Sequence, residues 1–339
     1  MGTAEQSAVI DDVQVTAKRI FDSISRELML VEEEFERQAR SNIQVIAYLG
    51  EYLRGSGGKR VRPALTILSN YAVGGNGANY SSIRMATVME FLHTATLVHD
   101  DVIDKAETRR NRPSINSEFG NQTAVLMGDW LYMSAFETSL AERSLPVLDI
   151  LTAVTRKMTE GELLQLTLLG RTDVSEEQYF DVIARKTAYL FSACCEIGAV
   201  LGGADTRTQN MLRDYGMNLG IAFQLVDDLL DFTSSEGILG KPAGADLLEG
   251  KVSLPLIFLL QRAPEMRSAV QTVINEASYQ SFSRAALLEA LERTGALQLA
   301  LQRAIEYASA ALEALDGLPD TPYAQVLSSI PTYIVERDR

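Results

Sequence analysis

The chain has 339 residues, of which 46% are hydrophobic and 22% charged, and its net charge is −14. This composition is typical of a soluble globular protein and excludes disordered, collagen-like and coiled-coil chains. The negative charge disfavours a general affinity for nucleic acid or anionic membranes, so an anionic substrate would need local cations or bound metal. With only two histidines in the chain, a site built from several imidazole ligands is nearly excluded.

Residues 1–12 contain no basic segment followed by an apolar one, and no apolar run has the roughly eighteen residues that a spanning helix needs. We therefore expect neither a signal peptide nor a transmembrane segment. The two cysteines, Cys194 and Cys195, are adjacent and cannot form an ordinary structural disulfide with each other. They fit a reducing cytoplasm, where we expect the protein to act.

Apolar residues recur every three or four positions through most of the sequence, and no sustained alternation competes with this period. The pattern predicts an almost entirely helical protein. We expect an N-terminal helical arm over about 1–40 and C-terminal helices over about 265–339. Turn-rich or charged segments predict loops at 55–58, 74–82, 105–121 and 234–250.

Two segments, 82–104 and 209–232, are apolar nearly all round, which is typical of central helices that others surround. Each closes with the same DDxxD pattern. Because residues three and four apart are neighbours on a helix, each motif is expected to bring three carboxylates within about 5–6 Å. The two clusters consist of Asp100, Asp101 and Asp104 and of Asp227, Asp228 and Asp231.

Carboxylates at these spacings repel one another, and the repulsion is poorly screened beside apolar helices. A set of oxygen ligands selects Mg²⁺ or Ca²⁺, and Mg²⁺ takes one or two carboxylates together with phosphate oxygens. Two such clusters facing each other would hold a diphosphate through bridging metals. A single motif is explained equally well as a solvated acidic helix end, but two arise by chance in fewer than about one chain in a hundred.

A glycine turn precedes a run of cations in the segment 57–63, GGKRVRP, which contains Lys59 and Arg62. Ammonium and forked guanidinium donors on a flexible turn suit a diphosphate that is bound without metal. Arg109 and Arg110 follow the first acidic cluster by one loop and could reach both anions. The alternative for these residues is a basic helix start or a surface salt bridge.

Further polar residues accompany the second acidic cluster. They are Lys186 and Thr187 within a helix, Gln224 one turn before the cluster, and Lys241 and Lys251 in the glycine-containing loop after it. Each alone is more often an exposed lysine or a core amide. His93 lies seven residues before Asp100 on nearly the same helix face and could donate to a phosphate, although a satisfied core histidine explains it equally well.

The motifs GGKRVRP, FLHTATLVHDDVID, RRNRPS, KT, FQLVDDLLD and GKPAGADLLEGK occur in this order. Through these motifs and their order, the sequence resembles the trans-isoprenyl diphosphate synthases of the polyprenyl synthetase family, in particular the long-chain synthases that make quinone side chains. The resemblance covers about residues 53–257. It implies a single all-α domain over 1–339, a helical bundle around a deep central cavity (the isoprenoid synthase fold), and a homodimer.

The resemblance also assigns roles to individual residues. It implies that isopentenyl diphosphate is bound by Lys59, Arg62, His93 and Arg110. It implies that the allylic diphosphate is held by Arg109, Lys186, Thr187, Gln224 and Lys241, with Lys251 nearby. The principal metal ligands would be Asp100, Asp104 and Asp227, assisted through water or hydrogen bonds by Asp101, Asp228 and Asp231. One departure is Asn111, where the family usually has glycine.

The reaction implied is the repeated head-to-tail condensation of isopentenyl diphosphate with an allylic diphosphate. About three Mg²⁺ ions and the cationic side chains would neutralise the departing diphosphate, so that the allylic C–O bond ionises. The alkene of isopentenyl diphosphate then attacks the carbocation, and the released diphosphate removes the proton. No protein nucleophile is required.

Small residues upstream of the first acidic cluster bear on product length. Ala95 and Thr96 stand where short-chain members of the family carry bulky aromatics, so the resemblance implies a product beyond twenty carbons, about thirty-five to forty-five. The floor of the tunnel would come from larger side chains, which pack the core equally well in the alternative view. These are Leu92, Met127, Trp130 and Leu131.

Several alternatives remain open at this point. A geranylgeranyl or farnesyl diphosphate synthase would share every motif but make a shorter product. A class I terpene cyclase would not need the GGKRVRP segment, and a non-catalytic subunit of a heteromeric synthase would not need all six aspartates. A di-iron carboxylate bundle is a further alternative because Glu90 and His93 have ExxH spacing, although two such motifs are expected there.

Overall fold

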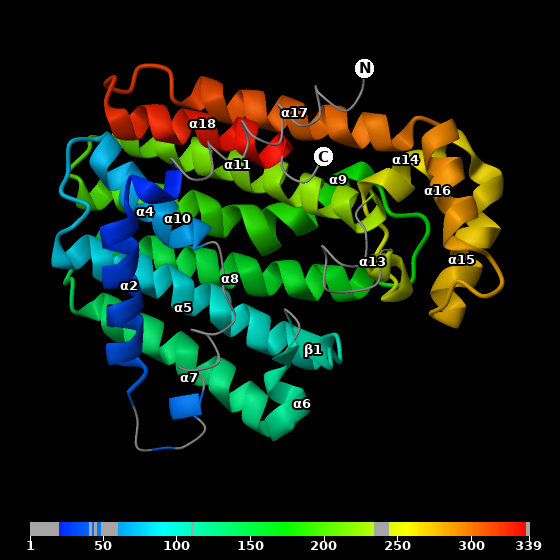
Figure 1. Cartoon of the computed structure of the whole chain (residues 1–339), viewed down its shortest axis with the longest axis horizontal. Helices are drawn as coiled ribbons and strands as arrows, with labels where there is room; N and C mark the ends of the chain where they lie inside the picture. The colour runs from blue at the N-terminus through cyan, green and yellow to red at the C-terminus, as the bar shows by residue number, and fades with distance from the viewer. Residues whose placement is uncertain are drawn as a thin grey trace. The chain divides into compact units, whose positions relative to one another are not determined.

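The computed structural model describes residues 20–40, 43, 46–48, 60–109, 112–233 and 244–336. Within these ranges the protein is almost entirely α-helical, and its β-structure is one antiparallel pair of two-residue strands (Figure 1). This confirms the predicted all-α class. The chain divides into two compact units that are each discontinuous in sequence.

The first unit comprises Met1–Thr155, Leu190–Gly216 and Ala314–Ile330. Its elements are α2 (Ser25–Gln38), α4 (Val61–Ala72), α5 (Tyr80–Ile103), β1 (Thr108–Arg109), β2 (Arg112–Pro113), α6 (Ile115–Phe119), α7 (Asn121–Leu140) and most of α10 (Tyr189–Leu201). Three helices begin in this unit and end in the other: α8 (Leu145–Leu168), α11 (Thr206–Thr233) and α18 (Pro322–Glu336).

The second unit comprises Arg156–Tyr189, Met217–Glu313 and Pro331–Arg339. Its remaining elements are α9 (Glu176–Ile183), a π-helical turn (Ala184–Ala188), α13 (Ala245–Leu248), α14 (Leu254–Arg262), a 3₁₀ turn (Pro264–Met266), α15 (Arg267–Glu276), α16 (Arg284–Arg293) and nearly all of α17 (Ala296–Ala314). The N-terminus of α9 is fixed by a reciprocal capping box between Ser175 and Gln178.

The predicted central helices 82–104 and 209–232 correspond to α5 and α11 within a few residues. Helix α5 begins at Tyr80 because the side chain of Asn79 accepts a hydrogen bond from the backbone N–H of Ser82 at 2.7 Å. Most of its residues are buried, as an apolar circumference predicts. The predicted loop at 105–121 is more ordered than expected, since it contains β1, β2 and α6.

Helix α2 lies across α4 and α5 (Figure 1) and is held there by polar as well as apolar contacts. The hydroxyl of Tyr71 donates to Glu27 at 2.8 Å, and the rings of Phe35 and Phe91 lie 4.3 Å apart. Because Glu27 is itself buried, this hydrogen bond satisfies a carboxylate that would otherwise be costly to bury. These contacts hold α2, which belongs to the predicted N-terminal arm, against α4 and α5.

Glycines allow α4 and α10 to approach closely. A Cβ on Gly198 would lie 2.4 Å from the backbone oxygen of Thr66 and 2.8 Å from the side chain of Ser69. Backbone cannot yield as the tip of a flexible side chain can, so the glycine is required by the packing. The close approach also lets the side-chain amide of Asn70 donate to the carbonyl of Gly198.

We expect Gly198→Ala to lower the free energy of unfolding by about 1–3 kcal/mol because the added methyl group overpacks this contact. Urea denaturation followed by circular dichroism measures the loss. The control is Glu289→Ala, which changes an exposed position on α16. A Gly198→Ala variant as stable as the wild type would show that α4 and α10 are not packed as described.

Both cysteines are free and buried in α10. Burial raises the pKa of the Cys194 thiol to about 12 and the pKa of Cys195 further. Because the thiolate is the reactive form, we expect neither thiol of the native protein to react with a disulfide reagent at pH 8. Both should react once guanidinium chloride unfolds the chain, and rapid labelling of the native protein would contradict this packing.

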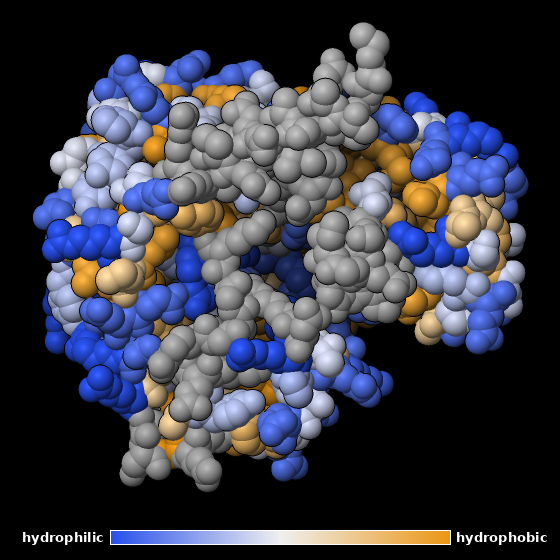
Figure 2. Space-filling model, viewed as in Figure 1, coloured by the Kyte–Doolittle hydropathy of each residue, from blue (hydrophilic) through white to orange (hydrophobic). Residues whose placement is uncertain are grey.

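Among the described residues, no helix combines the length with the apolar run that crossing a bilayer requires. On the face drawn in Figure 2, hydrophilic residues surround smaller hydrophobic areas. Some large apolar side chains nevertheless lie at the surface. The most exposed are Met29, Leu126, Met133, Leu145 and Leu163, each with at least 60% of its surface accessible.

Candidate active site

The first acidic cluster closes α5 with a Schellman motif. Lys105 adopts a left-handed conformation, with φ of 53°, and the N–H of Ala106 donates to the carbonyl of Asp101 at 2.9 Å. The N–H of Lys105 reaches the carbonyl of Val102 in the same motif. The turn therefore ends the helix directly after the third aspartate and leads the chain into β1.

Within this cluster the middle carboxylate differs from the other two. Asp101 is 2% exposed and accepts hydrogen bonds from Arg109, with Nε 2.7 Å from Oδ1. Burial raises the pKa of Asp101, and the guanidinium of Arg109 opposes that rise. Asp100 and Asp104 are half-buried. Arg109, which the resemblance assigns to a diphosphate, thus also holds the buried aspartate of its own motif.

Basic residues of the predicted isopentenyl diphosphate site lie at the start of α4 and on α5. Arg62 places its guanidinium over the ring of Phe191, 5.0 Å from the centroid, and His93 is half-buried. Arg60 adopts a left-handed conformation and forms ion pairs with Glu32 and Glu90. These pairs join the start of α4 to α2 and α5.

Glu90, which has ExxH spacing with His93, is held by an arginine. Glu90 accepts a hydrogen bond from Arg60 Nη1 at 2.6 Å and is 7% exposed. Across the described ranges, no three His, Cys, Asp or Glu side chains converge as a metal site made only of protein ligands would require. Arg60 thus links Glu90 of α5 to the start of α4.

In the second acidic cluster, on α11, Asp227 is half-buried while Asp228 and Asp231 are buried. Asp231 accepts hydrogen bonds from two residues at the start of α13. Its carbonyl accepts from the N–H of Gly244 at 2.7 Å, and its Oδ2 accepts from the N–H of Asp246 at 3.4 Å. An acidic side chain at the start of α13 also complements the helix dipole.

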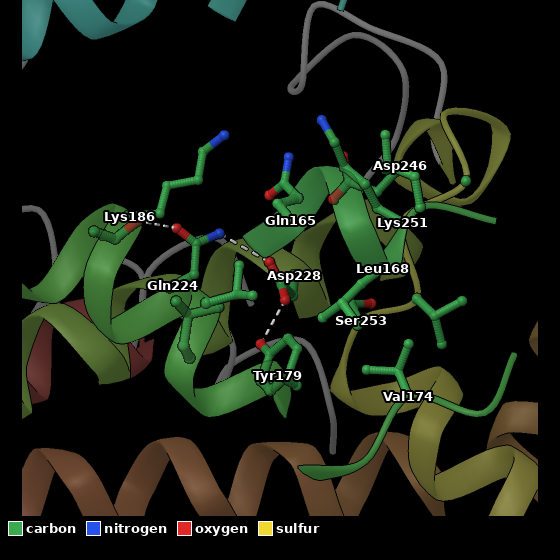
Figure 3. A pocket seen from close by; sticks show the side chains of 16 residues that line it. Gln165, Leu168, Val174, Tyr179, Lys186, Gln224, Asp228, Asp246, Lys251 and Ser253 are labelled. Atoms are coloured by element: carbon green, nitrogen blue, oxygen red, sulfur yellow. Dashed lines mark hydrogen bonds between the residues drawn. The ribbon is translucent and has the colours of Figure 1, made fainter. Parts of the chain in front are cut away.

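A cavity of about 160 Å³ lies in the second unit beside this cluster (Figure 3). One part of its wall is polar and the other aliphatic, as suits an amphiphilic anion. The polar residues are Gln165, Tyr179, Lys186, Thr187, Gln224, Asp228, Asp246, Lys251 and Ser253, and the aliphatic ones are Leu168, Leu169, Val174, Val182, Ile183 and Val252. The structure thus brings together four predicted substrate-binding residues and one predicted metal-site aspartate, Asp228.

Lys186 and Thr187 were expected within a helix, and they lie in the π-helical turn between α9 and α10. Widened turns of this kind occur frequently at functional sites. The turn packs against α8 where Gly161 leaves space, because a Cβ there would lie 2.8 Å from the backbone nitrogen of Lys186. The ammonium of Lys186 contacts both oxygens of Glu162, at 2.8 and 2.9 Å.

Asp228 receives hydrogen bonds on both carboxylate oxygens, from the Tyr179 hydroxyl at 2.5 Å and from the Gln224 amide at 2.9 Å. Even so, burial and the nearby charges of Asp246 and Asp227 raise the pKa of Asp228 to about 7. The second cluster therefore holds more negative charge than its own donors balance. A divalent cation with oxygen preference fits this donor set.

Sequence reasoning missed several residues that line this cavity or contact its lining residues. Tyr179 and Glu162 lie on helices other than that of the acidic cluster, and their contacts with Asp228 and Lys186 span 49 and 24 positions. Asp246 belongs to a quoted motif, GKPAGADLLEGK, so that motif was the signal that could have identified it. Three predicted site residues lie outside the described residues, namely Lys59, Arg110 and Lys241, as does Asn111.

The residues expected to set product length lie on α5 and α7 of the first unit. Ala95 is fully buried, whereas Thr96 is half-buried and donates its hydroxyl to the carbonyl of His93 at 2.7 Å. Trp130 is half-buried. The other three candidates for the tunnel floor, Leu92, Met127 and Leu131, are at most 2% exposed.

The model of the protein family "Polyprenyl synthetase" matches residues 43–291 of the chain. The chain is 39% identical over 323 residues to an octaprenyl diphosphate synthase of Escherichia coli, covering 95% of this chain and 99% of that protein. Two solved structures each share 34% sequence identity with this chain, and each alignment covers 95% of this chain. A decaprenyl diphosphate synthase from Rhodobacter capsulatus, 99% covered, has a TM-score of 0.89. A polyprenyl synthase from Caulobacter crescentus complexed with calcium and isoprenyl diphosphate, 98% covered, has a TM-score of 0.90.

Proposed function

The chain belongs to the polyprenyl synthetase family, and we propose that it condenses isopentenyl diphosphate with allylic diphosphates to make a long-chain all-trans polyprenyl diphosphate. It is a prenyltransferase with the isoprenoid synthase fold. The observation that carries the proposal is the cavity of the second unit, where Lys186, Thr187 and Gln224 meet the buried Asp228. Cations, amide donors and an excess of carboxylate in one small cavity suit a diphosphate that arrives with metal.

We assign the allylic diphosphate to the donors around this cavity. Of the residues that the structure describes, two cations line it: Lys186, paired with Glu162, and Lys251, paired with Glu249. An anionic ligand can join both ion pairs. Arg109 and Lys241 complete this set in the proposal. Isopentenyl diphosphate is assigned to the predicted basic residues of the first part of the chain, which are Lys59, Arg62, His93 and Arg110.

Mg²⁺ is the proposed cofactor, with about three ions per active site, by resemblance to the family. Asp100, Asp104 and Asp227 are the proposed ligands, since all three are half-buried and accessible to a hydrated ion. The buried Asp101 and Asp228 already accept hydrogen bonds from Arg109, Tyr179 and Gln224, so they fit an indirect role. Asp231, which anchors α13, is assigned the same role. When bound, the metal neutralises charge on the departing diphosphate.

In the proposed reaction, Lys186 and Gln224 hold the allylic diphosphate while its C1–O bond breaks and both electrons leave with the diphosphate. The C4 carbon of isopentenyl diphosphate bonds to C1, and the proton lost from its C2 passes to the diphosphate. The side chains act by orientation and electrostatic stabilisation, because donors placed around developing negative charge lower the barrier. The aliphatic wall limits the water that could capture the cation.

We propose a product of about thirty-five to forty-five carbons, with Ala95 and Thr96 beside the growing chain. Because Ala95 is fully buried, a larger side chain there must displace its neighbours or occupy the space of the product. We expect Ala95→Phe to shorten the product, as thin-layer analysis of the dephosphorylated alcohols would show. An unchanged product distribution from a folded variant would reject this assignment.

A homodimer is proposed through α7. Leu126, Met133 and Leu140 recur at seven-residue spacing on this helix, and they are 68%, 62% and 48% exposed. Such an apolar stripe on a helix is typical of an interface between chains. Met133→Glu is expected to give a monomer in light scattering, whereas Met29→Glu, at an equally exposed methionine of the same unit, leaves the mass unchanged. A monomeric wild type would contradict the proposal.

Incubation of the purified protein with Mg²⁺, an allylic diphosphate and labelled isopentenyl diphosphate tests the proposed function. We expect label in prenyl diphosphates longer than twenty carbons. Release of a hydrocarbon without incorporation would indicate a cyclase, and products of fifteen or twenty carbons would indicate a short-chain synthase. No turnover without a second protein would indicate a subunit of a heteromeric enzyme. The reaction is proposed to take place in the cytoplasm, which suits two free thiols.

A further inference from the structure

A chain of four hydrogen-bonded side chains crosses the cavity wall from α9 to the π-helical turn (Figure 3). The Tyr179 hydroxyl donates to Oδ2 of Asp228 at 2.5 Å, and the Gln224 amide donates from Nε2 to Oδ1 at 2.9 Å. At the other end, the hydroxyl of Thr187 donates to Oε1 of Gln224 at 2.8 Å. Tyr179 and Asp228 are both only 6% exposed.

The printed contacts give the chain a direction, because Asp228 in its ionised form can only accept. Asp228 therefore requires a donor from Gln224, which turns the NH₂ group of that amide toward Asp228 and its oxygen toward Thr187. One N–H of the Gln224 amide donates to Asp228. The second N–H is on the same nitrogen, in a side chain that lines the cavity. With the amide reversed, an oxygen would take that place and repel an anion.

We propose that Tyr179 is a positioning residue that holds Asp228 and, through it, fixes the Gln224 amide with its second N–H toward the allylic diphosphate. The inference rests on the proposed function, because it concerns the same cavity. Tyr179 lines the cavity, but its hydroxyl donates to Asp228. It removes the freedom of Asp228 to rotate, since a hydrogen bond to a charged acceptor is stronger than one between neutral groups.

The helix that carries Tyr179 and the aromatic rings beside it restrict the position of the Tyr179 hydroxyl. Its helix, α9, begins at a capping box and passes directly into the π-helical turn that carries Thr187. The ring of Tyr179 contacts that of Phe180, with centroids 5.4 Å apart, and Phe180 contacts Tyr307 of α17. Both ends of the hydrogen-bonded chain thus come from one continuous helical segment, and its middle comes from α11.

The test compares Tyr179→Phe with Tyr215→Phe. Tyr215 is an equally buried tyrosine whose hydroxyl donates to the backbone carbonyl of Leu327 in the first unit. We expect Tyr179→Phe to raise the KM for the allylic diphosphate about tenfold or more, because a hydrogen bond to a charged group is lost. The KM for isopentenyl diphosphate should stay within about twofold. Tyr215→Phe should change neither KM.

A measurement without turnover uses inorganic pyrophosphate and Mg²⁺ in titration calorimetry. Tyr179→Phe is expected to weaken pyrophosphate binding by a similar factor. At the far end of the chain, Thr187→Val removes the hydroxyl that donates to Gln224 and should bind pyrophosphate more weakly than the wild type. If Tyr179→Phe does not fold, Thr187→Val tests the same chain from its other end, and wild-type pyrophosphate binding by that variant would overturn the inference.

Equal allylic KM values in Tyr179→Phe and the wild type would overturn the inference, as would an equal rise of both KM values. Unchanged pyrophosphate binding in Tyr179→Phe would overturn it too. A wild type that never incorporates isopentenyl diphosphate would instead refute the proposed function. Calorimetry with pyrophosphate would still decide whether Tyr179 orients this anion site, so the two failures can be told apart.

Discussion

Replacing Asp100 by Asn should lower kcat for prenyl transfer by about a hundredfold to a thousandfold, as loss of one electrostatic contact to a developing charge does. Asp100 is half-buried at the end of α5, and we propose it as a principal Mg²⁺ ligand. Asparagine keeps the size of the side chain and removes its charge. Steady-state incorporation of labelled isopentenyl diphosphate at saturating substrates measures the change.

The control for this variant is Asp129→Asn, which removes the charge of an aspartate that is 60% exposed on α7 of the same unit. The end of α5 should keep its structure in Asp100→Asn, because the hydrogen bonds that close it use backbone carbonyls, those of Asp100, Asp101 and Val102. Equal melting temperatures for the two variants would show this. If Asp100→Asn turns over at the wild-type rate, the first acidic cluster does not bind catalytic metal.

The second large effect is expected for Lys186→Met, which should reduce kcat/KM for the allylic diphosphate by about a hundredfold. Its ammonium lies at the cavity, where Glu162 holds it with two contacts below 3 Å. Methionine retains most of the apolar length of the side chain but supplies no charge to the diphosphate. Initial rates at varied allylic substrate separate kcat from KM.

Lys157→Met is the matched control, because Lys157 is a similarly exposed lysine in an ion pair on α8, with Glu160. We expect it to leave both constants near the wild-type values. The Lys186 variant leaves Glu162 without its cation, so a double variant with Glu162→Gln should recover stability but not rate. Recovery of rate in the double variant would mean that Lys186 acts only as a structural partner of Glu162.

Much of this structure follows from local patterns in the sequence. The three-and-four spacing of apolar residues predicts helices, and the two DDxxD motifs end or nearly end helices α5 and α11, as expected. Gln224, expected one turn before the second motif, lies there on α11, and its amide donates to Asp228 four positions on. These features could be predicted because each depends on residues within a few positions of one another.

Contacts between helices could not be predicted in the same way. The tyrosine that holds Asp228 lies on α9, and Glu162, which holds Lys186, lies on α8. No spacing within one helix signals such a pair. The π-helical turn also escaped prediction, because it depends on packing against Gly161 rather than on a distinctive local sequence.

Two features of the first acidic cluster depend on irregular backbone. Lys105, a non-glycine residue, takes the left-handed position of the Schellman motif, although this place favours glycine. The turn leads into β1, from which Arg109 reaches back to Asp101. The sequence shows two arginines after the cluster, but only the structure shows that Arg109 pairs with Asp101, the middle aspartate of the cluster.

The most direct test of the account is equilibrium binding of a non-hydrolysable allylic thiodiphosphate, measured by calorimetry with Mg²⁺ and then with a chelator. The account predicts tight binding to the wild type only when Mg²⁺ is present, and weak binding to Asp100→Asn and Asp227→Asn in either condition. Equal affinity in the presence of the chelator, or wild-type affinity in both variants, would contradict the claim that these aspartates bind the substrate through metal.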